Sequence, residues 1–300
     1  MTADEFAELN KSLGHRVEYT QNHSWIFRDD KSVLSLPTLE DAFPSKAELN
    51  SLFYLGAKIV LFKTDLSIKN SYEYVFTGKT YGIECFESKI RNQIRKGLKD
   101  CTIANVTMDD MTGCGFNINR QTLEKHHRSV DYLDDKAKWT NYIATLMQYK
   151  DVYIKGAYVG GILAVYVVFI KVCNKYYIYH PFMDKQFSAS CPMNALIFTF
   201  INEVLEREST IDVSYGLASY SEKSGLDKFK KGMLFREMQC TRVVQVNQLL
   251  RIMVNGATHK LFKILCKTAN LKKSSMRKFE YVLDNKKTLN EYLRLYGDGR

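Results

Sequence analysis

Residues 151–205 carry the pattern that most constrains the fold, because three β-type runs are followed there by a switch to helical periodicity. Two turns, at 160–161 and 173–175, separate the runs and are short enough for antiparallel hairpins. From Pro192 onward, apolar residues recur at the spacing of one helix face. We therefore expect an antiparallel meander that leads through a polar loop into a helix, with strands over 152–158, 162–171 and 176–181.

Strands and helices are also predicted on both sides of this meander. The predicted strands cover 17–27, 32–36, 57–62, 71–76, 102–106, 210–216 and 237–246. The predicted helices cover 46–54, 88–101, 119–127, 137–149, 226–233, 248–270 and 287–296. Turn-rich joints and shifts in composition divide the chain into three regions, 1–108, 109–247 and a basic C-terminal segment, 248–300.

The charge of the chain is positive and unevenly placed. The formal net charge is +10, and no acidic residue occurs between Glu237 and Glu280. This favours an anionic partner, either tRNA or a membrane surface touched by the amphipathic stretch 248–278, although charge runs are commonly only solvated. The longest apolar runs are too short for a transmembrane segment. Seven cysteines without a C-x-x-C pair indicate reduced thiols in a cytoplasmic protein and predict no metal site.

Three short segments carry a resemblance to a known family. They are Ser88–Cys101, Asn194–Leu205 and Gly225–Phe235, the last of which reads GLDKFKKGMLF. Together with the element order predicted for 117–247, they resemble the GNAT acyltransferase superfamily, in the branch that contains FemAB-type peptidyl transferases. The resemblance implies an α+β fold with a mixed, mainly antiparallel sheet flanked by helices. It also implies two GNAT-like units in tandem, a partial one over 1–108 and an acyltransferase domain over 109–247.

The resemblance further implies that acyl-CoA, such as acetyl-CoA, is bound between the meander and its helix. The glycine-containing CoA signature of the family is nevertheless absent from 184–194. Small side chains in this loop can still let the backbone approach a pyrophosphate at the helix N-terminus. The residues predicted to bind the cofactor are Tyr179, Ser188, Ala189, Ser190 and Asn194.

In GNAT-like folds the strands that correspond to 176–181 and 210–216 diverge, and an extended donor arm can add to the open edge as a strand. Backbone N–H groups near Tyr179 can polarise the donor carbonyl there. His180 is the candidate base, because an imidazole titrates near the working pH, and Glu222 is the alternative base. The structural alternative is that His180 only makes a hydrogen bond at the end of a strand.

Four further side chains are candidates for chemistry. Tyr215 and Tyr220 can donate a proton to the leaving group, although most of the nineteen tyrosines are expected to be packing residues. Lys230 matches the lysine of the family motif and is expected to meet an anionic substrate or oxyanion, or else to pair with Asp227. Cys191, near a helix start, is expected either to have a lowered pKa and act as a nucleophile, or to be a structural thiol.

Three functions remain compatible with the sequence. The first is an N-acyltransferase that moves an acyl group from acyl-CoA to a small-molecule or peptide amine. The second is a FemAB-type peptidyl transferase that uses aminoacyl-tRNA as its donor. The third is a catalytically degenerate GNAT-like binding module, which the missing CoA signature favours.

Overall fold

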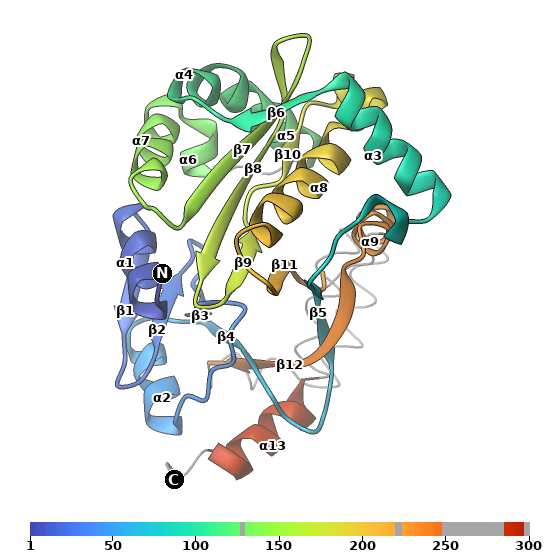
Figure 1. The fold of residues 1–300 in the computed structure, drawn as a ribbon. Helices are drawn as coiled ribbons and strands as arrows, with labels where there is room; N and C mark the ends of the chain where they lie inside the picture. Colours follow the sequence, from blue (N-terminus) through green and yellow to red (C-terminus); the bar gives the residue numbers. More distant parts are fainter. Residues whose placement is uncertain (127–129, 220–223, 248–284, 297–300) are drawn as a thin grey trace, which may run out of the picture. The chain divides into compact units, whose positions relative to one another are not determined.

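The structure is a computed structural model, and it describes residues 1–126, 130–219, 224–247 and 285–296 (Figure 1). The helix predicted over 248–270 lies outside the described residues. The chain forms two compact units. Unit 1 comprises residues 1–2, 74–216 and 225–236, and unit 2 comprises residues 3–73, 217–224 and 237–300.

Unit 1 contains a mixed, mainly antiparallel sheet, with the strand order β5-β11-β9-β8-β7-β6 and β10 paired with β8. Among the strand pairs of unit 1 that have a described register, only β9–β11 is parallel. The strands are β5 (Ser71–Gly78), β6 (Thr102–Asn105), β7 (Val152–Val159), β8 (Ile162–Val172), β9 (Lys175–Ile178), β10 (Phe182–Met183) and β11 (Ile211–Leu217). The predicted meander is confirmed as β7, β8 and β9.

Helices cover both faces of this sheet. They are η1 (Ile83–Cys85), α3 (Ser88–Asp100), α4 (Met108–Asp110), the π-helical turn η2 (Met111–Gly115), α5 (Phe116–His126), α6 (Asp131–Asp134), α7 (Lys136–Met147), η3 (Lys185–Ser190), α8 (Pro192–Leu205) and α9 (Ser224–Gly232). The helix predicted to begin at Pro192 is thus confirmed, with proline in its first turn. A mixed, mainly antiparallel sheet with flanking helices confirms the predicted fold class.

Strand β8 forms the centre of unit 1. Residues 163–170 are at most 2% exposed, so the strand is covered on both faces. On one face Phe169 stacks on Phe200 of α8, with ring centroids 3.5 Å apart. On the other, Tyr166 packs against Trp139 of α7, whose indole N–H donates to the Met111 carbonyl at 2.6 Å. The β7–β8 turn has positive φ at Gly160 and Gly161, which glycine adopts without strain.

Helices α3 and α8 approach each other closely at Gly97. A β-carbon at this position would lie 2.7 Å from the Cys191 carbonyl oxygen and 2.8 Å from the Ala195 β-carbon. Both neighbours belong to the first turn of α8 and its N-cap, which cannot move without shifting the helix start. Glycine therefore permits α3 to lie against the loop that precedes α8.

We expect Gly97→Ala to destabilise unit 1 by about 1–3 kcal/mol through overpacking, despite the better helix propensity of alanine. Gly225→Ala is the matched control, because Gly225 also lies in a helix but has open space where the β-carbon would stand. The control is expected to be neutral or mildly stabilising in urea-induced unfolding. Equal effects of the two substitutions would contradict the close approach.

In unit 2 the strands follow the order β1-β2-β3-β4-β12. Strands β3 and β4 are parallel, and the other pairs are antiparallel. Its elements are α1 (Ala3–Ser12), β1 (Arg16–Tyr19), β2 (Ser24–Phe27), β3 (Ser32–Leu36), α2 (Lys46–Tyr54), β4 (Ile59–Thr64), β12 (Arg236–Val246) and α13 (Lys286–Tyr296). The core of the unit includes Trp25, Phe62 and Tyr292, with Phe62 edge-to-face against both other rings.

The structure corrects two predicted strands. The single strand over 17–27 is wrong, because Thr20 and His23 close a turn that folds the segment into the hairpin β1–β2. The strand over 176–181 ends earlier, at Ile178.

The compact units divide the chain differently from the sequence-based regions. Strand β6 and helix α3 lie before residue 109 but belong with the meander in unit 1. The domain boundaries at 108 and 247 therefore stay a prediction about the GNAT-like units. No helix among residues 1–126, 130–219, 224–247 and 285–296 has the length and apolar character of a membrane span.

Candidate functional site

The candidate site lies where the two parallel strands of unit 1 separate. Strands β9 and β11 share three register pairs, Lys175–Asp212, Tyr176–Val213 and Tyr177–Ser214. Beyond Tyr177 and Ser214, no register pair joins the two strands within the described residues. We call this region, residues 178–181 and 215–216, the fork.

Local backbone chemistry explains why the strands separate. The Tyr179 N–H donates to the Val168 carbonyl at 2.8 Å, so it is used on the β8 side. Pro181 has no N–H to donate to a ladder. On the other strand, Gly216 has a φ of 86°, and its N–H donates to Ser214 Oγ at 3.1 Å. This left-handed residue lies two positions after Ser214, the last residue of β11 that pairs with β9, and changes the course of β11 beyond the paired segment.

Gly216→Ala is expected to destabilise unit 1 by about 1–2 kcal/mol, because the left-handed backbone is strained for a residue with a β-carbon. No atom lies within 4 Å of the β-carbon position, so the effect comes from the backbone alone. Gly216→Asn is the matched comparison and should cost less, since asparagine tolerates this conformation. Thermal unfolding of both variants measures the difference, and an alanine variant as stable as the wild type would refute the strained turn.

His180 lies in a buried aromatic cluster beside the fork. It is 7% exposed, and its Nε2 is 3.0 Å from the Tyr142 hydroxyl, with which it forms a hydrogen bond. The rings of Tyr132, Tyr179 and Phe182 surround it. Burial raises the pKa of the Tyr142 hydroxyl well above its usual value, so this partner stays neutral. The hydrogen bond fixes the imidazole and fits both a base and a structural histidine, so the catalytic role of His180 stays a prediction.

Lys230 lies against Tyr215, which belongs to the β11 part of the fork. The Lys230 side chain is buried at 5% exposure, and its ammonium lies 4.4 Å from the Tyr74 ring centroid and 4.9 Å from that of Tyr215. Two aromatic faces thus hold a cation beside β11. Within the described residues no ion pair joins Lys230 to Asp227, so the expected pairing is absent. The sequence did not identify Tyr74, since nothing local distinguishes it from the other tyrosines.

Tyr215 is held in place by aromatic packing with residues from and after α9. Its ring is 6.2 Å from Phe229 and 5.4 Å from Phe235, edge-to-face in both cases. Burial raises the pKa of the Tyr215 hydroxyl, which therefore keeps its proton at neutral pH. A neutral hydroxyl next to a cation can donate a hydrogen bond to a developing negative charge.

The loop before α8 contains a 3₁₀ helix, whereas a phosphate-binding loop leaves its backbone amides open to the ligand. Ser188, Ala189 and Ser190 belong to the 3₁₀ helix η3, and Ser188 and Ala189 are exposed. The Asp184 carboxylate caps this helix by accepting from the Gln186 N–H at 3.0 Å. Several amides that a pyrophosphate would need are therefore engaged within the loop.

Asn194 and Cys191, which adjoin this loop, are not arranged as ligand-binding residues would be. Asn194 is 7% exposed, and its Nδ2 contacts the Met233 sulfur at 3.5 Å, so its side chain is used in packing. Cys191 is the N-cap residue of α8 but makes no side-chain capping bond. Burial raises the pKa of its thiol, so the lowered pKa expected at a helix start is wrong. This favours the structural interpretation of Cys191.

Two of the predicted residues, Tyr220 and Glu222, lie outside the described residues. Among the residues that are described, no group of three or more His, Cys, Asp or Glu side chains is arranged to hold a metal ion.

Comparison with solved structures shows similarity along most of the chain. FemX superposes with a TM-score of 0.55 at 10% identity, covering 87% of this chain and 93% of its own. The C-terminal domain of a putative lysylphosphatidylglycerol synthetase from Agrobacterium fabrum gives a TM-score of 0.56 at 12% identity, covering 84% of this chain and 93% of its own. The chain has a GNAT-like, FemAB-type fold. L-PGS from Bacillus licheniformis shares it, with a TM-score of 0.50 and 11% identity over 83% of this chain and 90% of its own.

No protein-family model matches the sequence, and no curated protein sequence matches it either. At such low identity the structural neighbours show a common fold alone. In this GNAT-like, FemAB-type fold, the fork, His180 and the Tyr74–Lys230–Tyr215 cluster lie within unit 1.

Proposed function

We propose that this protein is an acyltransferase, which moves an acyl group from an activated ester or thioester to an amine. The observation that carries the proposal is the fork, where two parallel strands stop pairing beside a buried lysine held between two tyrosines. Open strand edges can pair with an extended donor, and the cation and hydroxyl at their side can stabilise an oxyanion.

Each predicted residue then has a role in the reaction. The amine nitrogen attacks the donor carbonyl carbon and forms a C–N bond, and Lys230 stabilises the resulting oxyanion. His180, oriented by Tyr142, accepts the proton that the amine loses. When the C–O or C–S bond breaks, Tyr215 gives its proton to the leaving oxygen or sulfur.

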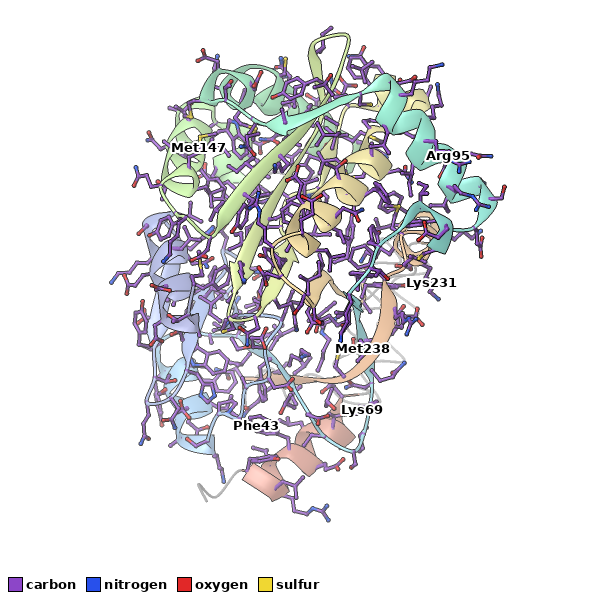
Figure 2. The ribbon with its side chains drawn as sticks, in the orientation of Figure 1. Phe43, Lys69, Arg95, Met147, Lys231 and Met238 are labelled. Carbon is purple, nitrogen blue, oxygen red and sulfur yellow. The ribbon has the colours of Figure 1, made fainter. Side chains whose placement is uncertain are left out.

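We favour an aminoacyl ester of tRNA as the donor. Exposed basic side chains gather on α3 and α9. The two helices lie close together, as shown by Gly232 of α9, where an added β-carbon would be only 2.9 Å from Ile90 of α3. In Figure 2, Arg95 and Lys231 project outward from these two helices. Such a surface attracts a phosphate backbone. The exposed basic residues are Lys89, Arg95, Lys96 and Lys99 on α3 and Lys228 and Lys231 on α9.

Acyl-CoA is the second candidate donor. The small residues Ser188, Ala189 and Ser190 lie just before the N-terminus of α8, whose positive end favours a phosphate. The engaged amides of η3 and the Asp184 carboxylate oppose this reading, which is why it ranks second. With either donor, a cytoplasmic location and a small-molecule or peptide amine acceptor are part of the proposal.

The donor can be identified by direct binding and turnover. The purified protein is incubated with tRNA charged with radiolabelled amino acids or with labelled acetyl-CoA, and loss of donor and salt-dependent retention are followed. Neutralising Lys89, Arg95 and Lys99 together should weaken tRNA retention about tenfold or more, with Lys46→Gln on α2 as control. Consumption of acetyl-CoA alone would move the proposal to the second donor. If neither donor is bound or consumed, the transferase proposal fails and the binding module remains.

A further inference from the structure

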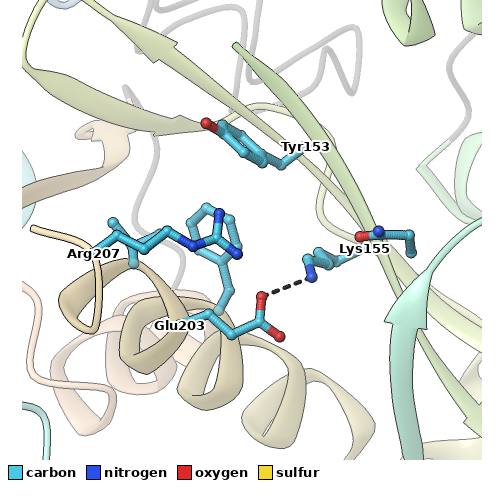
Figure 3. A pocket seen from close by; sticks show the side chains of 7 residues that line it. Tyr153, Lys155, Glu203 and Arg207 are labelled. Carbon is cyan, nitrogen blue, oxygen red and sulfur yellow. Dashed lines mark ion pairs between the residues drawn. The ribbon is translucent and has the colours of Figure 1, made fainter. Parts of the chain in front are cut away.

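A cavity of unit 1 lies away from the fork, between β7 and the C-terminal half of α8. It has a volume of about 200 Å³, and Figure 3 shows its labelled side chains around it. The cavity residues on α8 are Phe200, Glu203 and Val204, and Arg207 follows just after the helix ends at Leu205, whereas the loop beside the fork joins α8 at Pro192. At 1.5 Å per residue, Pro192 lies about 12 Å from Phe200 and about 18 Å from Val204 along the helix axis. The cavity is therefore separate from the proposed acyl-transfer site.

The charged groups of the cavity leave a net positive charge. Lys155 pairs with Glu203, with Nζ and Oε2 2.7 Å apart, and the Lys155 side chain is only 12% exposed. Arg207 is the other cation, and within the residues that the structure describes its guanidinium has no hydrogen bond or ion pair. Figure 3 shows the guanidinium directed toward the space between Lys155 and Tyr153. The planar Arg207 guanidinium can donate two parallel hydrogen bonds, and it lies near the Lys155 ammonium, which is paired with Glu203. This combination suits an anion with two acceptor oxygens.

The remaining walls of the cavity are largely apolar. Tyr153 and Phe200 meet with ring centroids 6.0 Å apart, and Phe200 and Val204 are 2% and 4% exposed. Asn105, at the end of β6, adds one amide. A fully hydrated phosphate gains nothing from aromatic walls, whereas an aromatic or aliphatic acid buries its body against them. The volume is too small for a nucleotide-sized ligand and suits a molecule of about ten heavy atoms.

We propose that this cavity binds a small organic carboxylate, whose carboxylate pairs with Arg207 and whose apolar body lies against Tyr153 and Phe200. Lys155 adds positive potential, while Glu203 keeps it in position. The ligand class follows from the planar guanidinium and the aromatic wall together. It does not depend on which donor the fork receives.

The proposal is tested on the full-length protein by calorimetric titration with benzoate, butyrate and inorganic phosphate at constant ionic strength. Benzoate is expected to bind with a dissociation constant of about 1 mM, as befits a ligand of this size, with butyrate weaker and phosphate weaker still. Arg207→Met should weaken benzoate binding about tenfold or more, and Arg207→Lys should do so less. Arg95→Met on α3 is the control, because Arg95 is also an exposed arginine of unit 1.

Each contrary result overturns the proposal in a different way. Absence of benzoate binding at tens of millimolar removes the site. Phosphate binding as tightly as benzoate removes the carboxylate class. Equal losses of benzoate affinity in the Arg207→Met and Arg95→Met variants show that benzoate responds to the surface charge of the protein in general. Saturation-transfer NMR on benzoate supplies an independent readout, since its ring protons should receive magnetisation while it is bound to the wild type and much less in the Arg207→Met variant.

Discussion

Lys230→Met is expected to reduce acyl transfer by about 10²–10³-fold while the protein stays folded. Lys230 is 5% exposed, and its ammonium lies close to the rings of both Tyr74 and Tyr215. Methionine has a similar length and fills the same space, so burial of the side chain is kept while the charge that faces an oxyanion is lost. Because an apolar replacement also removes the cost of burying a charge, unfolding free energy should change by no more than about 1–2 kcal/mol.

The measurement is single-turnover transfer with whichever donor proves active, together with urea unfolding of the same preparations. Lys136→Met is the control, since Lys136 is an exposed lysine of unit 1 on α7, outside the basic surface of α3 and α9, and its variant should keep its activity. Full activity in Lys230→Met would exclude the oxyanion role. A large loss of stability with a parallel loss of activity would instead assign Lys230 to packing.

Unit 2 is expected to lose about 3 kcal/mol of stability as the pH falls from about 5 to about 2, through one carboxylate. Glu48 is 5% exposed, and burial alone would raise its pKa. Hydrogen bonds from the Thr20 hydroxyl, the Ser45 and Asn22 amides and the His23 ring outweigh this and lower the pKa to about 2. A carboxyl with a lowered folded-state pKa stabilises the fold above its unfolded value of 4.5, and this contribution disappears as protonation sets in.

Glu48→Gln should flatten this acid dependence and lower the stability at pH 7 by a similar amount. The Ser45–Glu48 capping box of α2 would lose its ionised partner in the variant. Asp4→Asn on α1 is the control, because Asp4 is an exposed carboxylate of the same unit. Chemical unfolding at a series of pH values tests the prediction, which is wrong if the Glu48 variant keeps the slope of the wild type.

The meander and helix α8 could be predicted because their signals are local. Gly160-Gly161 marks a two-residue hairpin, and Pro192 marks the first turn of a helix. The β1–β2 turn was missed because the sequence Thr20–His23 has no glycine or proline. The end of β9 depends on where β11 turns away, and that is set by Gly216 on a strand distant in sequence.

The candidate site was predictable to a smaller extent. The motif resemblance indicates Lys230, and the chemistry of the imidazole indicates His180. Their partners Tyr74 and Tyr142 come from other elements, and only the packed structure brings them together. The same holds for Arg207 and Tyr153, whose cavity forms between a helix and a strand that the sequence predicts separately.

The close packing at Gly97 determines how much of the chain is needed to keep the candidate site intact. Helix α3 ends before residue 109, yet it covers the beginning of α8. A protein fragment that starts at residue 109 would expose the apolar side of α8 to water and leave the 185–190 turn without its neighbour. Truncations intended to keep unit 1 should begin no later than Ser71, the first residue of β5, because the continuous stretch of unit 1 starts within this strand, at Tyr74.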